Sequence, residues 1–171
     1  MTFRLIDDLL SADNPRFEEF ASIPVQADGK GGIYPSALVL NKTSITNTKV
    51  NFVGMTISWP RDGNISLDIF DKRAEFPFQV IRYPDMNSVI PTHLPYGSFT
   101  GGLYRIYKIC NSVTIFIDRC VELSDTLLKK GCSRRRLWKL FRRFLCLQDP
   151  LRWRDGLNTL CRRYTKKLYM L

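Results

Sequence analysis

The chain has 171 residues, of which 44% are hydrophobic, and 26 Lys and Arg outnumber 16 Asp and Glu to give a formal net charge of +10. This hydrophobic content supports a packed core and excludes a wholly disordered chain. No apolar run reaches the ~18 residues of a membrane-spanning helix, and the N-terminus does not read as a signal peptide. We therefore expect a nuclear or cytoplasmic protein that is not secreted. The 5 cysteines form no CxxC pair, which favours reduced thiols over a zinc site.

The charge is unevenly distributed along the chain. Residues 1–99 carry 9 Lys and Arg against 11 Asp and Glu, a net charge of −2, whereas residues 100–171 carry 17 against 5, a net charge of +12. This asymmetry predicts an acidic partner for the C-terminal part, either nucleic acid or an anionic membrane surface.

The N-terminal half reads as β-rich with many turns. Residues 2–10 predict a strand, a turn and a second strand, with Asp7 and Asp8 at the turn. A short helix is predicted over residues 14–20 with Asn14 as its N-cap, and a short strand over residues 38–40, after a loop rich in Gly and Pro.

The clearest β signal follows. Residues 50–59 predict a strand, residues 60–63 a turn, and residues 65–70 a second strand whose Ile65, Leu67 and Ile69 point inward. Gly54 inside the first strand predicts a bulge or a close backbone approach. Prolines then predict an irregular connector over residues 76–95, ordered by Phe76, Phe78 and Tyr83.

Helical periodicity begins after Gly97. A first helix carries Leu103, Ile106, Tyr107 and Cys110 on one face, and a second is predicted over residues 114–130 and ends at Gly131. Ser133 opens a third helix to about residue 147, and Asp149-Pro150 opens a fourth. The sequence thus predicts an α+β protein with domains over residues 1–96 and 97–171.

The third predicted helix contains no acid. Leu137, Leu140, Phe141 and Phe144 lie at core spacing, and the remaining arc carries six cations: Arg134, Arg135, Arg136, Lys139, Arg142 and Arg143. Cations that neutralise phosphates release counterions and bind nucleic acid without sequence preference. A solvated helix face, a membrane-surface helix and a partner-binding helix are the alternatives.

The adjacent carboxylates of Asp7 and Asp8 follow an apolar stretch. A turn that holds two carboxylates together can bind Mg²⁺, a hard cation that prefers oxygen ligands. The alternative is a helix start, where acids neutralise the helix dipole. Lys42, after the predicted strand at residues 38–40, either assists a developing phosphate charge or is simply exposed.

The order of these features resembles the C-terminal half of a reverse transcriptase, most closely the eukaryotic retroelement enzymes of the Penelope-like type or a related group. The likeness spans about residues 3–145. It rests on the Asp-Asp turn, the Phe-x-Gly hairpin, the string from Phe70 to Phe78, then Tyr83-Pro84, Ile90-Pro91, Tyr96-Gly97 and Leu103-Tyr104-Arg105.

The resemblance implies a partial palm with a β-hairpin, followed by an α-helical thumb bundle. It implies that Asp7 and Asp8 are catalytic carboxylates that hold Mg²⁺ in the intact enzyme, an RNA-directed DNA polymerase (nucleotidyltransferase) of a retrotransposon. Its implied partner is an RNA/DNA primer-template hybrid. The residues expected to bind this nucleic acid are the six cations of the basic helix together with Lys42, Phe52, Gly54, Arg105 and Lys108.

Two departures from the family pattern bear on activity. Leu5 stands where family members usually carry an aromatic residue. The two-metal mechanism also needs a first carboxylate and fingers upstream of the Asp-Asp turn, and this sequence begins six residues before Asp7. We therefore expect a fragment that is inactive alone, with an upstream palm and fingers segment as a further partner. The alternative is a stand-alone basic nucleic-acid-binding module without catalysis.

Overall fold

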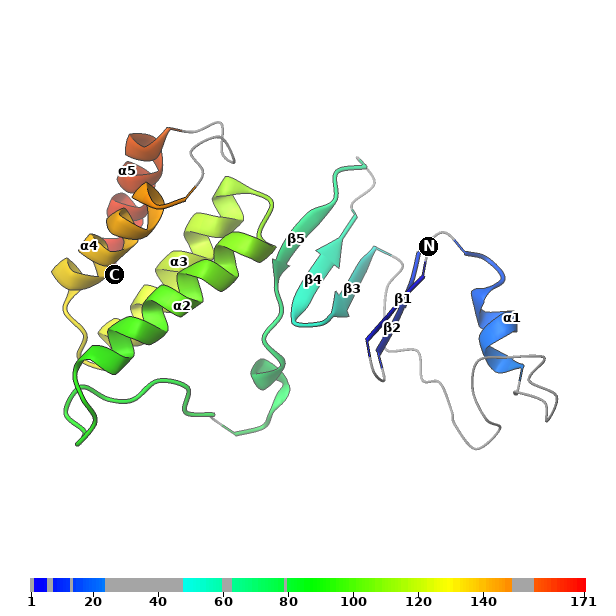
Figure 1. The fold of residues 1–171 in the computed structure, drawn as a ribbon, viewed down its shortest axis with the longest axis horizontal. Coiled ribbons are helices and arrows are strands. Elements are labelled where there is room, and N and C mark those ends of the chain that lie inside the picture. The colour runs from blue at the N-terminus through cyan, green and yellow to red at the C-terminus, as the bar shows by residue number, and fades with distance from the viewer. Residues whose placement is uncertain are drawn as a thin grey trace. The chain divides into compact units, whose positions relative to one another are not determined.

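The computed structural model describes residues 2–5, 8–12, 14–23, 48–59, 63–78, 80–148 and 156–171. These residues form an α+β fold with short strands early in the chain and longer helices late in it, which confirms the predicted fold class at this level (Figure 1). The strands form one sheet of β1-β2 and one of order β3-β4-β5. The chain divides into two compact units, Met1–Val53 and Gly54–Leu171.

The first unit begins with the predicted strand-turn-strand. β1 (Thr2–Leu5) pairs antiparallel with β2 (Asp8–Ser11), in a register that places Leu5 opposite Asp8. α1 (Phe17–Ser22) begins after a turn in which the Asn14 carbonyl accepts a hydrogen bond from the Phe17 N–H at 3.1 Å. The helix thus starts later than predicted. β3 (Lys49–Phe52) ends the unit. The strand and loop predicted between residues 24 and 47 lie outside the described residues.

The second unit opens with the predicted hairpin. β4 (Met55–Ser58) pairs antiparallel with β5 (Ser66–Ile69), and Met55 lies opposite Ile69. Leu67 and Ile69 are half-buried as predicted, but Ile65 precedes the strand and is 60% exposed. The inward orientation predicted for Ile65 is therefore wrong, because the strand pairing begins one residue later.

The strand predicted over residues 50–59 is not continuous. A turn at Val53 and Gly54, with φ of 49° and 73°, separates β3 from β4. Two successive positive φ values are typical of the tightest hairpin turns, where Asn-Gly or Asp-Gly is the usual sequence. A β-branched residue rarely adopts this conformation, so the sequence predicted that Val53 lies in a strand. The predicted bulge at Gly54 is wrong, and the group that approaches Gly54 is an arginine side chain and not a backbone.

Four helices complete the second unit (Figure 1): α2 (His93–Ile109), α3 (Val113–Leu128), α4 (Arg134–Cys146) and α5 (Leu157–Leu168). The predicted bounds of α3 and α4 are confirmed to within two residues. α3 ends as predicted, because Gly131 has a φ of 84° and the N–H groups of Gly131 and Cys132 bond back to the Leu128 and Leu127 carbonyls. These two bonds form a Schellman motif. The predicted start of the fourth helix at Asp149 lies outside the described residues.

The helices share one core. α3 packs against α2 and α5, and α4 packs against α2 and α5. Tyr164 is fully buried, stacks on Phe141 with ring centroids 3.8 Å apart, and shares a hydrogen bond of 2.6 Å with the Ser124 hydroxyl. The largest buried apolar side chains around this pair are Phe99, Leu103, Phe116, Ile117, Leu127, Leu137 and Leu168.

The connector between hairpin and helices is largely irregular, as predicted. A short 3-10 helix, η1 (Lys72–Glu75), begins it, and Tyr83 is buried. Phe76 and Phe78 stack on each other but stay 45% and 63% exposed. α2 begins at His93, four residues before the predicted start at Gly97, because a proline, here Pro95, fits the first turn of a helix. The domain boundary predicted between residues 96 and 97 falls inside α2.

Side chains from α3 and from the loop before it form hydrogen bonds with β5 and the residue before it. The Asn111 amide accepts a hydrogen bond from the Leu67 N–H at 2.9 Å and donates one to the Ile65 carbonyl at 2.7 Å. The Arg119 guanidinium forms two bonds with the Asp68 carboxylate, at 2.7 and 2.5 Å. The hairpin and the helices of the second unit are therefore held together by polar contacts as well as by packing.

Candidate nucleic-acid interface

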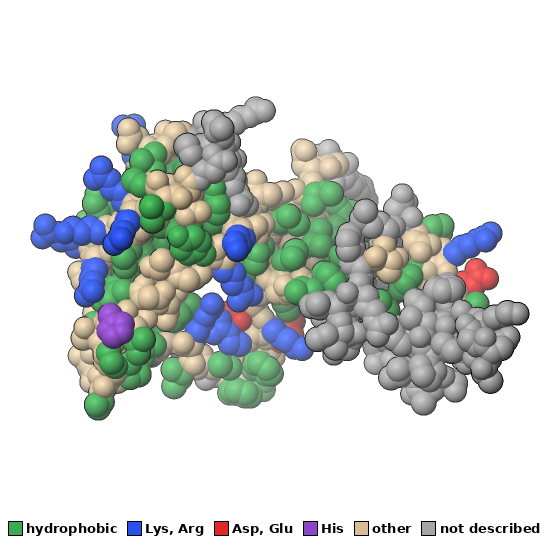
Figure 2. Space-filling model, in the orientation of Figure 1, with side chains coloured by type: hydrophobic (Ala, Val, Ile, Leu, Met, Phe, Trp, Pro, Cys, Tyr) green, Lys and Arg blue, Asp and Glu red, His purple; other side chains and the backbone are tan. Residues whose placement is uncertain are grey.

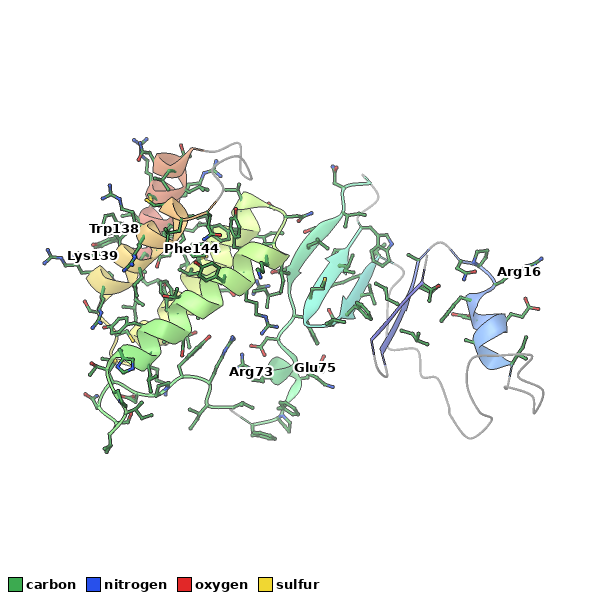
Figure 3. All side chains as sticks on the ribbon, viewed as in Figure 1. Arg16, Arg73, Glu75, Trp138, Lys139 and Phe144 are labelled. Atoms are coloured by element: carbon green, nitrogen blue, oxygen red, sulfur yellow. The ribbon has the colours of Figure 1, made fainter. Side chains whose placement is uncertain are left out.

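α4 is amphipathic, with an apolar side in the core and a cationic side in solvent. Its buried residues are Leu137, Phe141, Phe144 and Leu145. Five cations are exposed, namely Arg135, Arg136, Lys139, Arg142 and Arg143, and Arg134 is half-buried. In Figure 3 Lys139 points away from the helices while Phe144 points toward them, and Figure 2 shows Lys and Arg side chains gathered over this edge of the helical region. We call the five exposed cations the α4 face.

Aromatic rings support three arginines of α4. The Arg136 guanidinium carbon lies 4.0 Å from the centre of the Tyr96 ring, and the corresponding distances are 5.5 Å for Arg134 over Tyr169 and 5.7 Å for Arg142 over Trp138. A cation held over a ring face gains electrostatic attraction and loses side-chain freedom. These guanidinium groups are thus partly preorganised, with N–H edges left for an acceptor.

Two of the supporting rings are themselves hydrogen-bonded. Trp138 donates its indole N–H to the Thr165 hydroxyl of α5 at 2.9 Å. The Tyr96 hydroxyl accepts a bond from the Ser133 N–H at 3.0 Å, just before α4 begins. The sequence places Trp138 on the same predicted helix as Arg142, four residues before it. It gave no signal for Tyr96 or Tyr169, which lie far along the chain from the arginines they support.

The acids of the helical region are occupied elsewhere. On α3, Asp118 pairs with Lys167 of α5, Glu122 with Arg119 at 2.6 Å, and Asp125 with Lys129 at 2.6 Å. Among the described residues no carboxylate forms an ion pair with a cation of α4. Three arginines also occupy the start of α4, where the helix dipole disfavours positive charge. The α4 face is therefore uncompensated within the described part of the chain.

A second group of predicted site residues lies at and near the turn formed by Val53 and Gly54. The Arg105 guanidinium of α2 donates to the Gly54 carbonyl at 3.4 Å, and a β-carbon at Gly54 would lie 2.8 Å from Arg105 Nη2. The structure thus brings Gly54 and Arg105 together, and the positive φ of Gly54 favours glycine at this position. Lys108 is exposed one turn further along α2, and Phe52 is half-buried at the end of β3.

The remaining predicted site residues are less defined. Asp7 and Lys42 lie outside the described residues, and of Asp8 only the backbone is described, as the first residue of β2. Within the described ranges no group of three or more His, Cys, Asp and Glu side chains could hold a metal ion. The expected Mg²⁺ site at Asp7 and Asp8 therefore stays a prediction.

Comparisons with protein-family models, with curated proteins and with solved structures find no match to this chain. In the part of the chain that the structure describes, no helix is both long and apolar enough to cross a membrane.

Proposed function

We propose that the protein binds nucleic acid through the α4 face. The observation that carries this proposal is the absence of any carboxylate partner for the α4 cations among the described residues, in a helical region whose α3 acids are all paired. Repulsion between neighbouring like charges destabilises a helix, and the packing of α4 needs none of these charges. A polyanion that neutralises them is the partner that this surface fits.

The chemistry of the α4 face favours phosphate groups. Each guanidinium presents N–H donors in a planar fork that matches two phosphate oxygens, and the supporting rings leave those edges free. Binding of this kind releases counterions from the nucleic acid, so affinity falls with salt and depends little on base sequence.

The finer form of the proposal is a reverse-transcriptase-like chain with the end of the palm and the thumb. In this form Asp7 and Asp8 hold Mg²⁺, the Gly54 turn with Arg105 grips the primer, and the basic helices bind the primer-template hybrid. The order of features along the sequence supports it, as does the contact between Gly54 and Arg105. The alternative, a basic nucleic-acid-binding module without catalysis, shares the α4 face and dispenses with the metal.

The first test is a charge-neutralised variant of α4. We define the α4 triple variant as Arg135→Gln, Lys139→Gln and Arg143→Gln, three exposed residues of the α4 face other than the arginines that lie over aromatic rings. Fluorescence anisotropy with a labelled duplex at ~0.1 M salt should show an affinity lowered at least ~30-fold, because three phosphate contacts are lost.

A matched control removes the same charge elsewhere. The control triple variant carries Arg16→Gln, Lys49→Gln and Lys129→Gln, all exposed and none on α4. It should bind the duplex within ~3-fold of the unmodified chain at that salt concentration. Equal losses in both triple variants would mean that net charge alone drives binding, and would overturn the assignment to α4.

Vesicles test the competing membrane-surface hypothesis. The unmodified chain should co-sediment with anionic lipid vesicles more weakly than it binds duplex at the same salt concentration, because the apolar side of α4 is committed to the core. Tighter binding to vesicles than to duplex would contradict the proposal and favour a peripheral membrane role.

Primer extension tests the finer form. The 171-residue chain with Mg²⁺ or Mn²⁺ should extend no primer, because the mechanism needs a carboxylate from an upstream palm strand. Extension that Asp7→Asn abolishes would contradict this expectation, and would make the chain a polymerase in its own right.

A further inference from the structure

Two arginines away from α4, Arg73 of η1 and Arg82 of the connector, share one carboxylate. Asp71 is the N-cap of η1, and its carboxylate accepts the Arg73 Nε–H at 2.7 Å. A second arginine, Arg82, approaches the same carboxylate at 3.7 Å. The bond to Arg73 lowers the pKa of the Asp71 carboxyl, so this carboxylate is charged at neutral pH. Figure 3 labels Arg73 beside η1.

The side chain of Tyr83 lies against this cluster. Tyr83 is 6% exposed, and the Arg82 guanidinium carbon lies 4.9 Å from the centre of its ring. Its hydroxyl is buried and finds no hydrogen-bond partner among the described residues. Burial raises the pKa of Tyr83, while the charges of Arg82, Arg73 and Arg105 act in the opposite direction. Tyr83 therefore remains a neutral phenol with an unused donor, within the electrostatic reach of three guanidinium groups.

Charge and donor counts both favour an anionic ligand. Arg73 and Arg82 face one carboxylate, that of Asp71, so the cluster keeps an excess of one positive charge. The ion pair with Asp71 uses only part of the five N–H donors that each guanidinium carries. The side chains of Arg73 and Arg82 are 29% and 37% exposed, so both can reach a ligand in solvent.

We propose that Arg73, Arg82 and the Tyr83 hydroxyl form a second phosphate-binding site, separate from the α4 face. A tetrahedral phosphate can accept hydrogen bonds from several directions at once, which suits donors from η1 and from the connector. The ligand is a phosphate group, either one in a nucleic-acid backbone or a free phosphate or pyrophosphate ion. The Tyr83 hydroxyl turns to the bound oxyanion and gains the partner that it lacks.

The test is a titration of the full chain with sodium phosphate in place of sodium chloride at constant ionic strength, followed by NMR at the arginine Nε–H groups. The signals of Arg73 and Arg82 should shift together and saturate, and pyrophosphate should give the same pattern. Shifts that do not saturate, or that appear equally at all arginines, would overturn the proposal.

Tyr83→Phe is the most informative variant. Removing a buried hydroxyl without a partner should leave the melting temperature unchanged or raise it, while phosphate affinity should fall ~10-fold because a hydrogen bond to a charged ligand is lost. Tyr104→Phe, at a tyrosine of α2 that is 40% exposed, is the matched control and should leave phosphate affinity unchanged. Equal phosphate affinity in Tyr83→Phe and the unmodified chain would remove Tyr83 from the site.

Two further experiments test this site independently of the α4 face and identify the source of the phosphate. The α4 triple variant should titrate with phosphate like the unmodified chain, so either proposal can fail while the other stands. A duplex that competes with phosphate at the Arg82 signal would identify the ligand as a backbone phosphate, and saturation by phosphate without such competition would identify a free ion. Arg82→Gln should abolish the titration, and a titration that survives it would contradict the site.

Discussion

α3 and α4 are neighbouring helices of one bundle, and each buries an apolar side in the same core. Their exposed sides differ. The acids of α3 each pair with a cation from α3 itself or from the residues around it. The cations of α4 pair with no carboxylate in the described part of the chain, and three of them, Arg134, Arg136 and Arg142, lie over aromatic rings instead. Packing therefore explains why both helices fold, but it does not explain the charge of α4. The nucleic-acid binding that we propose would explain this charge.

Truncating a buried ring of α4 should destabilise the protein far more than truncating an exposed cation beside it, and this is the largest effect that we expect. Phe141→Ala removes a fully buried ring that stacks on Tyr164, which should lower the free energy of unfolding by ~3–5 kcal/mol. Arg142→Ala, at the next residue, should change it by no more than ~0.5 kcal/mol. Chemical denaturation measures both. A similar loss for the two variants would mean that α4 does not bury the side described.

Cysteines on the two helices offer a second contrast. Cys120 of α3 is buried, which raises the pKa of its thiol well above the usual value, whereas Cys146 of α4 is exposed. Cys146 should react with iodoacetamide at least ~100-fold faster than Cys120, because only an accessible thiolate is the nucleophile. Peptide mass spectrometry after timed quenching measures the two rates.

Alkylation of Cys146 also tests where the nucleic acid binds. Cys146 lies on the solvent side of α4, among the cations of the α4 face. A saturating duplex should slow its alkylation ~5-fold or more if nucleic acid covers this side. Free access to Cys146 in the presence of bound duplex would place the nucleic acid elsewhere.

The smallest expected effect is the stability change on removing the charges of each helix. The α4 triple variant should be as stable as the unmodified chain or up to ~1 kcal/mol more stable, because like-charge repulsion is relieved. Asp118→Asn, Glu122→Gln and Asp125→Asn together remove the ion pairs of α3 and should cost ~1–2 kcal/mol. Thermal denaturation at low salt compares the two. A loss of stability in the α4 triple variant would show that its charges serve the fold.

Sequence alone predicts the parts of this molecule that depend on local pattern. The apolar spacing along α3 and α4, and Gly131 after α3, set the helix bounds without any knowledge of tertiary contacts. The turn at Val53 could not be predicted this way, because a β-branched residue at positive φ contradicts its own local preference. Tertiary pairing overrides that preference here.

The candidate site also has parts that the sequence predicts and parts that it does not. The cations of α4 were predicted because they are adjacent in sequence and lack acids between them. Two of their aromatic supports, Tyr96 under Arg136 and Tyr169 under Arg134, are separated from them by tens of residues, and no local pattern joins them. Tyr83 was predicted only as an ordering residue, because its unpartnered hydroxyl is a property of the packed structure.

The most direct test of the central claim is the salt dependence of duplex binding by the unmodified chain and the two triple variants. A plot of log K against log salt concentration should be shallower by ~2.7 for the α4 triple variant, since each lost phosphate contact removes ~0.9 from the slope. The control triple variant should keep the slope of the unmodified chain. One common slope for all three proteins would contradict the claim that the α4 face contacts phosphates.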